Sequence, residues 1–244
     1  MGVAGQTISG QDADGRIYDV AGTSVRIWQG RLAEAPADED LRLLSGEESA
    51  RYRSFHSPLP AARYAGAHAA LRRALGSVLG TGPAAIGFGR ALCPLCGAPR
   101  HGRPVITFPL TRLHFSLSHS GADWLCAVAE GVAVGADVEG LRPQAPPELY
   151  EAVLSASELT YLARRPPQTR PVEFARCWTR KEAVMKGSGT GLAADPRRVE
   201  VHPDHGTALV RHRDAGSAPA TWAVPDLPAG PGHRAAVAVA RARR

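Results

Sequence analysis

The sequence predicts an α+β fold in which two similar α/β halves pack on one another as an intramolecular pseudo-dimer. The order strand, helix, strands occurs twice, at positions about 110 residues apart, and each half contains a helix that carries arginine or lysine. The length of 244 residues is long for one domain and short for two large ones. We expect a flexible N-terminal tail over residues 1–20, an N-terminal α+β half over 21–132 and a C-terminal α+β half over 133–244.

The N-terminal half is expected to contain one strand, then helices, then further strands. Ser45 is followed by acidic residues, as at the start of a helix. Alanine and leucine, which favour helix, dominate the segment 61–79. The predicted order is a strand at 25–28, helices from Ser45 and over 61–79, a loop region with short strands at 80–104, and a strand at 114–118.

Strands also frame the C-terminal half. Apolar runs at 124–129 and 132–139 flank Glu130 and Gly131, so we expect a β-hairpin with a two-residue turn. Later strands are expected at 199–202, 207–211, 221–224 and 235–240.

Helices are predicted between these strands. The segment 149–162 has helical character, and a capping box that begins at Ser155 leaves open whether it forms one helix or two. A further helix begins near Pro171 and continues to Lys186, after which three closely spaced glycines end it.

This last helix contains Lys181 and Lys186, the only two lysines of the chain. Lysine is a compact charge whose pKa can be tuned, so it suits a site that moves a proton near a phosphate. Trp178, Glu182 and Lys186 lie four residues apart along one side of the helix. The alternatives are an ordinary surface ion pair and two solvated lysines.

Two carboxylates end the predicted strand at 132–139. Asp137 and Glu139 share one face of the strand, and beside a phosphate such a pair suits Mg²⁺. The alternative is an exposed acidic strand end. Ser118 and His119 end another strand, where backbone N–H groups, hydroxyls and an imidazole can meet an oxyanion. A hydrogen-bonded turn histidine is the alternative there.

Four cysteines in this length do not make a disulfide framework. Cys93 and Cys96, with His101 five residues later, form half of a zinc site, whereas a structural zinc ion needs four ligands. A turn without zinc is therefore favoured. Cys126 and Cys177 stand alone in apolar surroundings and are expected to be small buried side chains.

The net charge of +6 indicates a polyanionic partner, which can be nucleic acid, a phosphorylated cofactor or an acidic protein. The sequence contains neither a signal peptide nor an apolar run long enough to cross a bilayer. We therefore expect a soluble, cytoplasmic protein without a membrane partner.

Taken together, FSLSHSG, GADVE and WTRKEAVMKGSGTGL, in this order, resemble the Sfp-type (surfactin-synthetase-activating type) 4′-phosphopantetheinyl transferases. The HGRP segment at 101–104 and the arginine-bearing helix at 61–79 fit the same family. The resemblance extends over residues 25–240 and implies a monomeric pseudo-dimer. Ser116 stands where the family usually has asparagine.

The resemblance also implies roles for individual residues. The metal carboxylates, for Mg²⁺ with Mn²⁺ as an alternative, are Asp137, Glu139 and Glu182. Catalysis is assigned to Glu182, as the general base, and Lys186, as the group that stabilises or protonates the leaving 3′,5′-ADP. Coenzyme A contacts are assigned to Arg53, Arg63, Arg72, Arg103, Pro104, Ser118, His119, Lys181 and Lys186.

The implied reaction is the Mg²⁺-dependent transfer of the 4′-phosphopantetheine group from coenzyme A to a serine of an acyl or peptidyl carrier protein. Carriers of fatty-acid, polyketide or nonribosomal-peptide synthesis all remain open as substrates. A basic nucleic-acid-binding module with a zinc knuckle at Cys93 and Cys96 is the alternative from another class. It explains the positive charge but not the three carboxylates, and few aromatic residues interleave the basic ones. A protein that binds coenzyme A without turnover is a third reading.

Overall fold

The computed structural model describes residues 15–99, 101–142 and 145–241. The first part contains β1 (Arg16–Val20), β2 (Thr23–Arg31), α1 (Asp38–Leu43), α2 (Gly46–Arg53), α3 (Pro58–Leu79), β3 (Gly87–Arg90), β4 (Pro104–Phe108), β5 (Leu113–Ser120) and β6 (Asp123–Glu130). The second part contains β7 (Val134–Gly140), α4 (Pro147–Val153), α5 (Ala156–Ala163), α6 (Arg170–Ser188), β8 (Thr207–Arg211), β9 (Thr221–Leu227) and β10 (His233–Ala240). Short 3-10 helices lie at Pro83–Ala85, Pro167–Thr169, Gly191–Ala193 and Pro196–Arg198.

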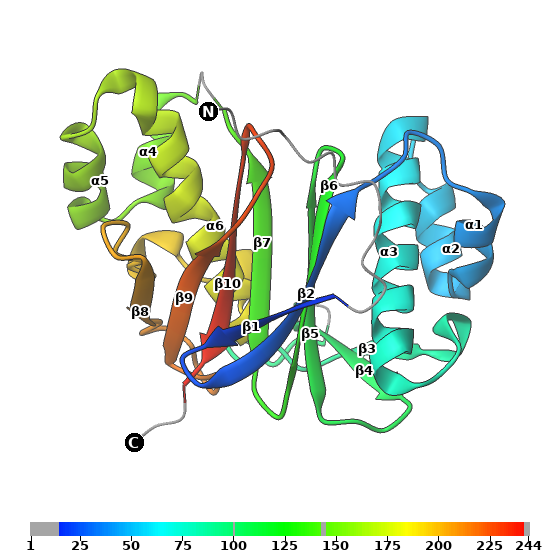
Figure 1. The fold of residues 1–244 in the computed structure, drawn as a ribbon. Helices are drawn as coiled ribbons and strands as arrows, with labels where there is room; N and C mark the ends of the chain where they lie inside the picture. Colours follow the sequence, from blue (N-terminus) through cyan, green and yellow to red (C-terminus); the bar gives the residue numbers. More distant parts are fainter. Residues whose placement is uncertain (1–14, 100, 143–144, 242–244) are drawn as a thin grey trace, which may run out of the picture.

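Two four-stranded antiparallel sheets form the centre of the described chain, with strand orders β1-β2-β6-β5 and β7-β10-β9-β8. Figure 1 shows the sheets between two groups of helices, with α3, α1 and α2 on one side and α6, α4 and α5 on the other. The predicted α+β class is confirmed, and the pseudo-dimer relation of the two parts stays a prediction. No helix in the described ranges has both the length and the apolar character needed to cross a bilayer.

Three apolar cores hold these layers together. One lies between α3 and the first sheet, one between the two sheets, and one between α6 and the second sheet. Representative members are Leu75 and Phe115 of the first core, Ile27 and Val237 of the second, and Met185 and Trp222 of the third. Burial of apolar surface on both faces of each sheet fixes the register of its strands.

Helix α6 crosses β7 at unusually close range because both elements have glycine at the crossing. A Cβ atom on Gly135 would lie 1.9 Å from the carbonyl oxygen of Ala183, and one on Gly187 would lie 2.7 Å from the Trp222 ring. Any larger residue at either position would push the helix away from the strand. Gly187 belongs to the helix itself. The helix ends at Gly189, which adopts the left-handed conformation with a φ of 79°.

A row of serines joins β5 to β7, which are edge strands of different sheets. The hydroxyl oxygens accept hydrogen bonds from the backbone of β7: Ser116 from Ala136 at 3.0 Å, Ser118 from Val138 at 3.4 Å and Ser120 from Gly140 at 3.1 Å. Buried backbone N–H groups need such partners. The hydroxyl of Ser116 thus helps to bind the two sheets together.

The predicted hairpin through Glu130 and Gly131 is wrong. Both apolar runs are strands, but β6 pairs with β2 and β5, whereas β7 pairs with β10 of the other sheet. The chain leaves one sheet and enters the other at Gly131, which has a φ of 68°. Gly131 therefore does form a turn, but the strand that pairs with β7 is β10, which lies far away in the sequence.

Two further predictions at the edges of the sheets are corrected. The tail predicted over 1–20 fails for its last residues, because Arg16–Val20 forms β1 and pairs with β2; residues 1–14 lie outside the described part. The strand predicted at 199–202 is absent from the described structure, in which Val199 makes a single bridge to His212. In both cases, pairing with a neighbouring strand, and not the local sequence, determines whether the segment becomes a strand.

The two helix starts predicted at serines are confirmed. Ser45 accepts a hydrogen bond from the Glu48 N–H at 3.2 Å, while the Glu48 carboxylate accepts one from the Ser45 N–H at 2.8 Å. Ser155 and Glu158 form the same capping box at the start of α5, so the segment 149–162 is divided into two helices.

His212 gives the fold a predictable response to acid. The side chain is fully buried just after β8, and neither ring nitrogen has a hydrogen-bond partner among the residues that the structure describes. Burial lowers its pKa below the ordinary 6.5, against the opposing influence of Asp214. Because the folded state then binds the proton less readily than the unfolded state, this contribution to stability is present above pH 6.5 and lost as the pH falls below it.

As the pH is lowered through about 6, we expect His212 to lower the urea midpoint of the unaltered chain, while the raised pKa of Glu182 acts in the opposite direction. His212→Phe, which has a similar volume and cannot be protonated, should show a weaker pH dependence in the same titration. An equal slope in both proteins would assign the acid response to other groups.

Candidate active site

The candidate site lies where the end of β7 meets the last turns of α6. The Lys186 Nζ donates to the Asp137 Oδ1 at 2.6 Å and to the Ser118 Oγ at 2.8 Å. The Ser118 hydroxyl donates to the same Asp137 oxygen at 2.7 Å. Three elements, β5, β7 and α6, therefore meet in one hydrogen-bonded triangle.

Asp137 is almost completely buried, with 1% of its surface exposed. Burial raises the pKa of this carboxyl group, and the positive charge of Lys186 opposes the increase. The second oxygen, Oδ2, is buried and has no hydrogen-bond partner among the described residues. A buried carboxylate oxygen without a partner is costly, so this atom is suited to a ligand that the protein alone does not supply.

Glu182 projects from α6 one turn before Lys186. Burial, followed by the negative charge of Asp137, raises the pKa of Glu182 to about 7. Glu139 adds to this effect and Lys186 opposes it. Three carboxylates that repel one another in a partly desolvated site favour a cation among them.

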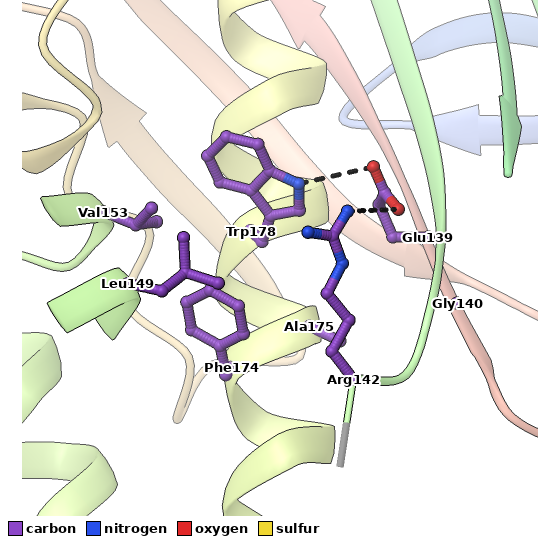
Figure 2. A pocket seen from close by; sticks show the side chains of 8 residues that line it. All are labelled: Glu139, Gly140, Arg142, Leu149, Val153, Phe174, Ala175 and Trp178. Carbon is purple, nitrogen blue, oxygen red and sulfur yellow. Dashed lines mark hydrogen bonds and ion pairs between the residues drawn. The ribbon is translucent and has the colours of Figure 1, made fainter. Parts of the chain in front are cut away.

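Glu139 is held at the mouth of the site by three neighbours. It accepts hydrogen bonds from Ser120 at 3.0 Å and from the Trp178 indole at 3.4 Å, and Arg142 lies 3.9 Å from it. Figure 2 shows the Trp178 and Arg142 side chains turned toward this carboxylate. Sequence reasoning missed Ser120 and Arg142; the alternation of serines along β5 is the signal that could have identified Ser120.

A mostly apolar pocket opens beside Glu139. Its lining comes from β7, the chain after it, α4 and α6, and consists of Glu139, Gly140, Arg142, Leu149, Val153, Phe174, Ala175 and Trp178 (Figure 2).

Cationic groups surround the opposite side of the triangle. His119 is exposed at the end of β5; desolvation lowers its pKa, and the positive charges of Lys186, His68 and Arg63 lower it further. Arg63 on α3 therefore lies within electrostatic range of the site. Arg103 is half-buried against Gly189, whose added Cβ would lie 3.5 Å from the Arg103 side chain. This side of the site suits phosphate oxygens.

The other assigned contacts divide into two groups. Arg53 is exposed at the end of α2, and Pro104 is exposed at the start of β4. Arg72 is wrong as a ligand contact, because it is 1% exposed and its guanidinium group binds Glu48 at 2.7 Å and the carbonyl oxygens of Pro83 and Ile86. It anchors α3 to α2 and to the following loop.

Lys181 is also wrong as a coenzyme A contact. It is fully buried, forms an ion pair with Glu158 at 2.6 Å, and donates to the carbonyl oxygens of Pro196 and Val199. All of its donors are used inside the protein, so it holds α5 and the chain after α6 against α6.

Among the described residues, the tightest group of potential metal ligands is not the carboxylate set. The ligand atoms of Cys93, Cys96 and His101 all lie within 4.8 Å of one another. The oxygens of Asp137, Glu139 and Glu182 are more widely spread.

The family model of the 4′-phosphopantetheinyl transferase superfamily matches residues 133–240. The 4′-phosphopantetheinyl transferase HetI of Nostoc sp. is 32% identical over 174 residues, 69% of this chain and 70% of the relative. A 4′-phosphopantetheinyl transferase of Bacillus subtilis is 26% identical over 162 residues, 66% of this chain and 67% of the relative. The L-aminoadipate-semialdehyde dehydrogenase-phosphopantetheinyl transferase of Eremothecium gossypii is 32% identical over 209 residues, 81% of this chain and 65% of the relative.

Proposed function

Because the chain belongs to the 4′-phosphopantetheinyl transferase superfamily and is an enzyme of this class, we propose that it moves the 4′-phosphopantetheine group of coenzyme A to a carrier-protein serine. The released product is 3′,5′-ADP, the metal is Mg²⁺, and the subtype is the long, Sfp-type enzyme. The observation that carries the proposal is the contact of Lys186 with Asp137, whose other oxygen is buried without a partner, beside Glu139 and Glu182.

The donor set fits a hard divalent cation. Asp137, Glu139 and Glu182 would hold Mg²⁺ through carboxylate oxygens, which this ion prefers. The unpartnered Asp137 Oδ2 and the raised pKa of Glu182 are both relieved by a nearby positive charge. When bound, the ion supplies charge neutralisation at the pyrophosphate of coenzyme A.

The protein's own residues account for positioning and proton transfer. The hydroxyl of the carrier serine attacks the β-phosphorus, a new phosphorus–oxygen bond forms, and the bond to 3′,5′-ADP breaks. Glu182 accepts the serine proton as the general base. Lys186 stabilises the departing phosphate, with Asp137 and Ser118 fixing the position of its Nζ.

The rest of the coenzyme A molecule can be placed by charge. Phosphate groups are assigned to the cationic side of the site, near His119, Arg63 and Arg103, and the exposed Arg53 and Pro104 stay candidate contacts. The pantetheine arm is assigned to the mostly apolar pocket lined by Glu139 and Trp178 (Figure 2).

Mass spectrometry of purified apo-carriers tests the reaction. Carriers from fatty-acid, polyketide and nonribosomal-peptide synthesis are each incubated with the enzyme, coenzyme A and Mg²⁺. A gain of one phosphopantetheine on at least one carrier, lost when Mg²⁺ is removed with a chelator, is expected. No gain on any of the three carrier types would contradict the proposal.

Glu182→Gln is expected to lower kcat by about a hundredfold, because the amide cannot accept the serine proton. The substitution keeps the volume of the side chain and removes a charge that the site desolvates, so the fold should remain. The measurement is the rate of holo-carrier formation at saturating coenzyme A. Glu151→Gln, at an exposed position of α4, is the matched control, and an equal kcat in both variants would remove Glu182 from the proton-transfer step.

A further inference from the structure

The loop between β3 and β4 folds back on itself around Cys93. The Cys93 backbone N–H donates to the Ala98 carbonyl at 3.1 Å, and the Gly97 N–H donates to the Cys93 carbonyl at 2.8 Å. Gly97 has a φ of 69°, which allows this tight turn. Cys93 is 2% exposed, whereas Cys96 and His101 face solvent.

Two sulfur atoms and one imidazole nitrogen converge in this loop. Their ligand atoms lie within 4.8 Å of one another, and the Cys96 Sγ is 3.3 Å from the His101 Nδ1. The backbone N–H groups of Cys96 and Leu95 point toward the Cys93 sulfur. Both cysteines are free thiols in the structure. The loop therefore presents electron-rich donors at the spacing of a metal site.

The types of donor atom in the loop determine which metal ion it favours. Thiolate and imidazole ligands in a small tetrahedral set favour zinc, whereas Mg²⁺ takes oxygen ligands. A redox role for the two cysteines is less suited to this place, because such pairs act at the start of a helix and Cys93 lies in a turn that no helix follows.

We propose that Cys93, Cys96 and His101 bind one zinc ion, with the fourth coordination position left to a solvent ligand, and that this ion fixes the loop from which Arg103 enters the active site. The second half of the proposal rests on the proposed function. This zinc site is separate from the Mg²⁺ site in residues and in donor chemistry.

Only a short stretch of backbone separates the proposed zinc ligands Cys93, Cys96 and His101 from Arg103. A Cβ on Gly102, the residue after His101, would lie 1.6 Å from the Ala91 carbonyl oxygen, so the two sides of the loop touch there. The Ala91 N–H donates to the Arg103 carbonyl at 3.0 Å. Arg103 then packs on Gly189, at the end of the helix that carries Lys186. A zinc ion bound to His101 would therefore restrict the movement of the backbone that positions Arg103.

Elemental analysis of the full chain, purified without chelator, tests the site directly. We expect close to one zinc ion per chain, and a thiolate-to-metal charge-transfer band after replacement of zinc by Co²⁺. Cys96→Ser and His101→Ala, both at exposed positions, should lose zinc and the band, while His205→Ala, an exposed histidine elsewhere, should keep both. A zinc-free unaltered chain, or full zinc retention in the combined Cys96→Ser and His101→Ala variant, would overturn the proposal.

Kinetics test the link to Arg103. Loss of zinc in His101→Ala should raise KM for coenzyme A by up to about tenfold, the effect of weakening one hydrogen bond to a charged group, with kcat retained. An unchanged KM in a variant shown to lack zinc would overturn the role of the ion in placing Arg103. Because zinc content is measured without substrate, a failure of the proposed reaction would appear separately, as an unaltered chain that binds zinc but modifies no carrier.

Discussion

Asp137→Asn is expected to lower kcat/KM for phosphopantetheine transfer by about a thousandfold. The substitution keeps the size of the side chain and removes its negative charge. It thereby removes the charge that pairs with Lys186, whose Nζ lies 2.6 Å from Asp137 Oδ1, and replaces the buried oxygen that is suited to a cation by an NH₂ group. In phosphoryl transfer nearly all of the rate enhancement comes from positioning and charge, so a single lost charge at this point has a large effect.

The fold should survive this change, because burial raises the pKa of Asp137 and the charged form is therefore costly to the folded state. Circular dichroism and the thermal midpoint check the fold, and the rate of holo-carrier formation over a series of Mg²⁺ concentrations checks the activity. Asp204→Asn, at an exposed loop position, is the control. A folded Asp137→Asn enzyme with normal Mg²⁺-dependent turnover would show that Asp137 is not part of the catalytic site.

Short-range patterns predicted the elements that carry the site. The spacing of Asp137 and Glu139 places them on one face of a strand, and the spacing of Glu182 and Lys186 places them on one side of a helix. The sequence contained no direct sign of how the strand and helix meet. Their approach depends on Gly135 and Gly187, two glycines far apart in the chain. The individual roles of the site residues stay proposals.

The sequence did contain an indication that Lys181 is buried and does not contact coenzyme A. Lys181 lies four residues after Cys177 and seven after Phe174, on the apolar face of its helix, which the structure shows to be buried. Its neighbour Glu182 is turned by about 100° around the helix axis and faces the site. The ion-pair partner Glu158 belongs to another helix, so the sequence could not identify it. In the N-terminal part, the buried Arg72 is likewise paired with a carboxylate of another helix, that of Glu48.

The hairpin error has a different cause. Turn residues specify that the chain changes direction, and Gly131 does so, but they do not specify which strand pairs with which. Strand β7 pairs with β10, close to the C-terminus, and its other edge is closed by the serine hydroxyls of β5. Side-chain closure of a strand edge produces no apolar period, and the alternating serines of β5 do not identify the strand to which they bind.

Lys186→Arg is expected to lower kcat by about a hundred- to a thousandfold although the positive charge is kept. The Lys186 Nζ fits between Asp137 and Ser118, at 2.6 Å and 2.8 Å. A guanidinium group is planar and larger, and it cannot release a proton in a protein. It would therefore displace one of these partners, and it could stabilise the leaving phosphate only by charge.

The separation of kcat from KM distinguishes this explanation from a simple loss of binding. Since the charge near the phosphates is retained, KM for coenzyme A should change much less than kcat in Lys186→Arg, whereas Lys186→Ala should impair both. Both parameters come from initial rates of holo-carrier formation, with the thermal midpoint as the control for folding. A kcat of Lys186→Arg close to that of the unaltered enzyme would show that position 186 needs only a positive charge, and proton donation to the departing 3′,5′-ADP would have to come from another group.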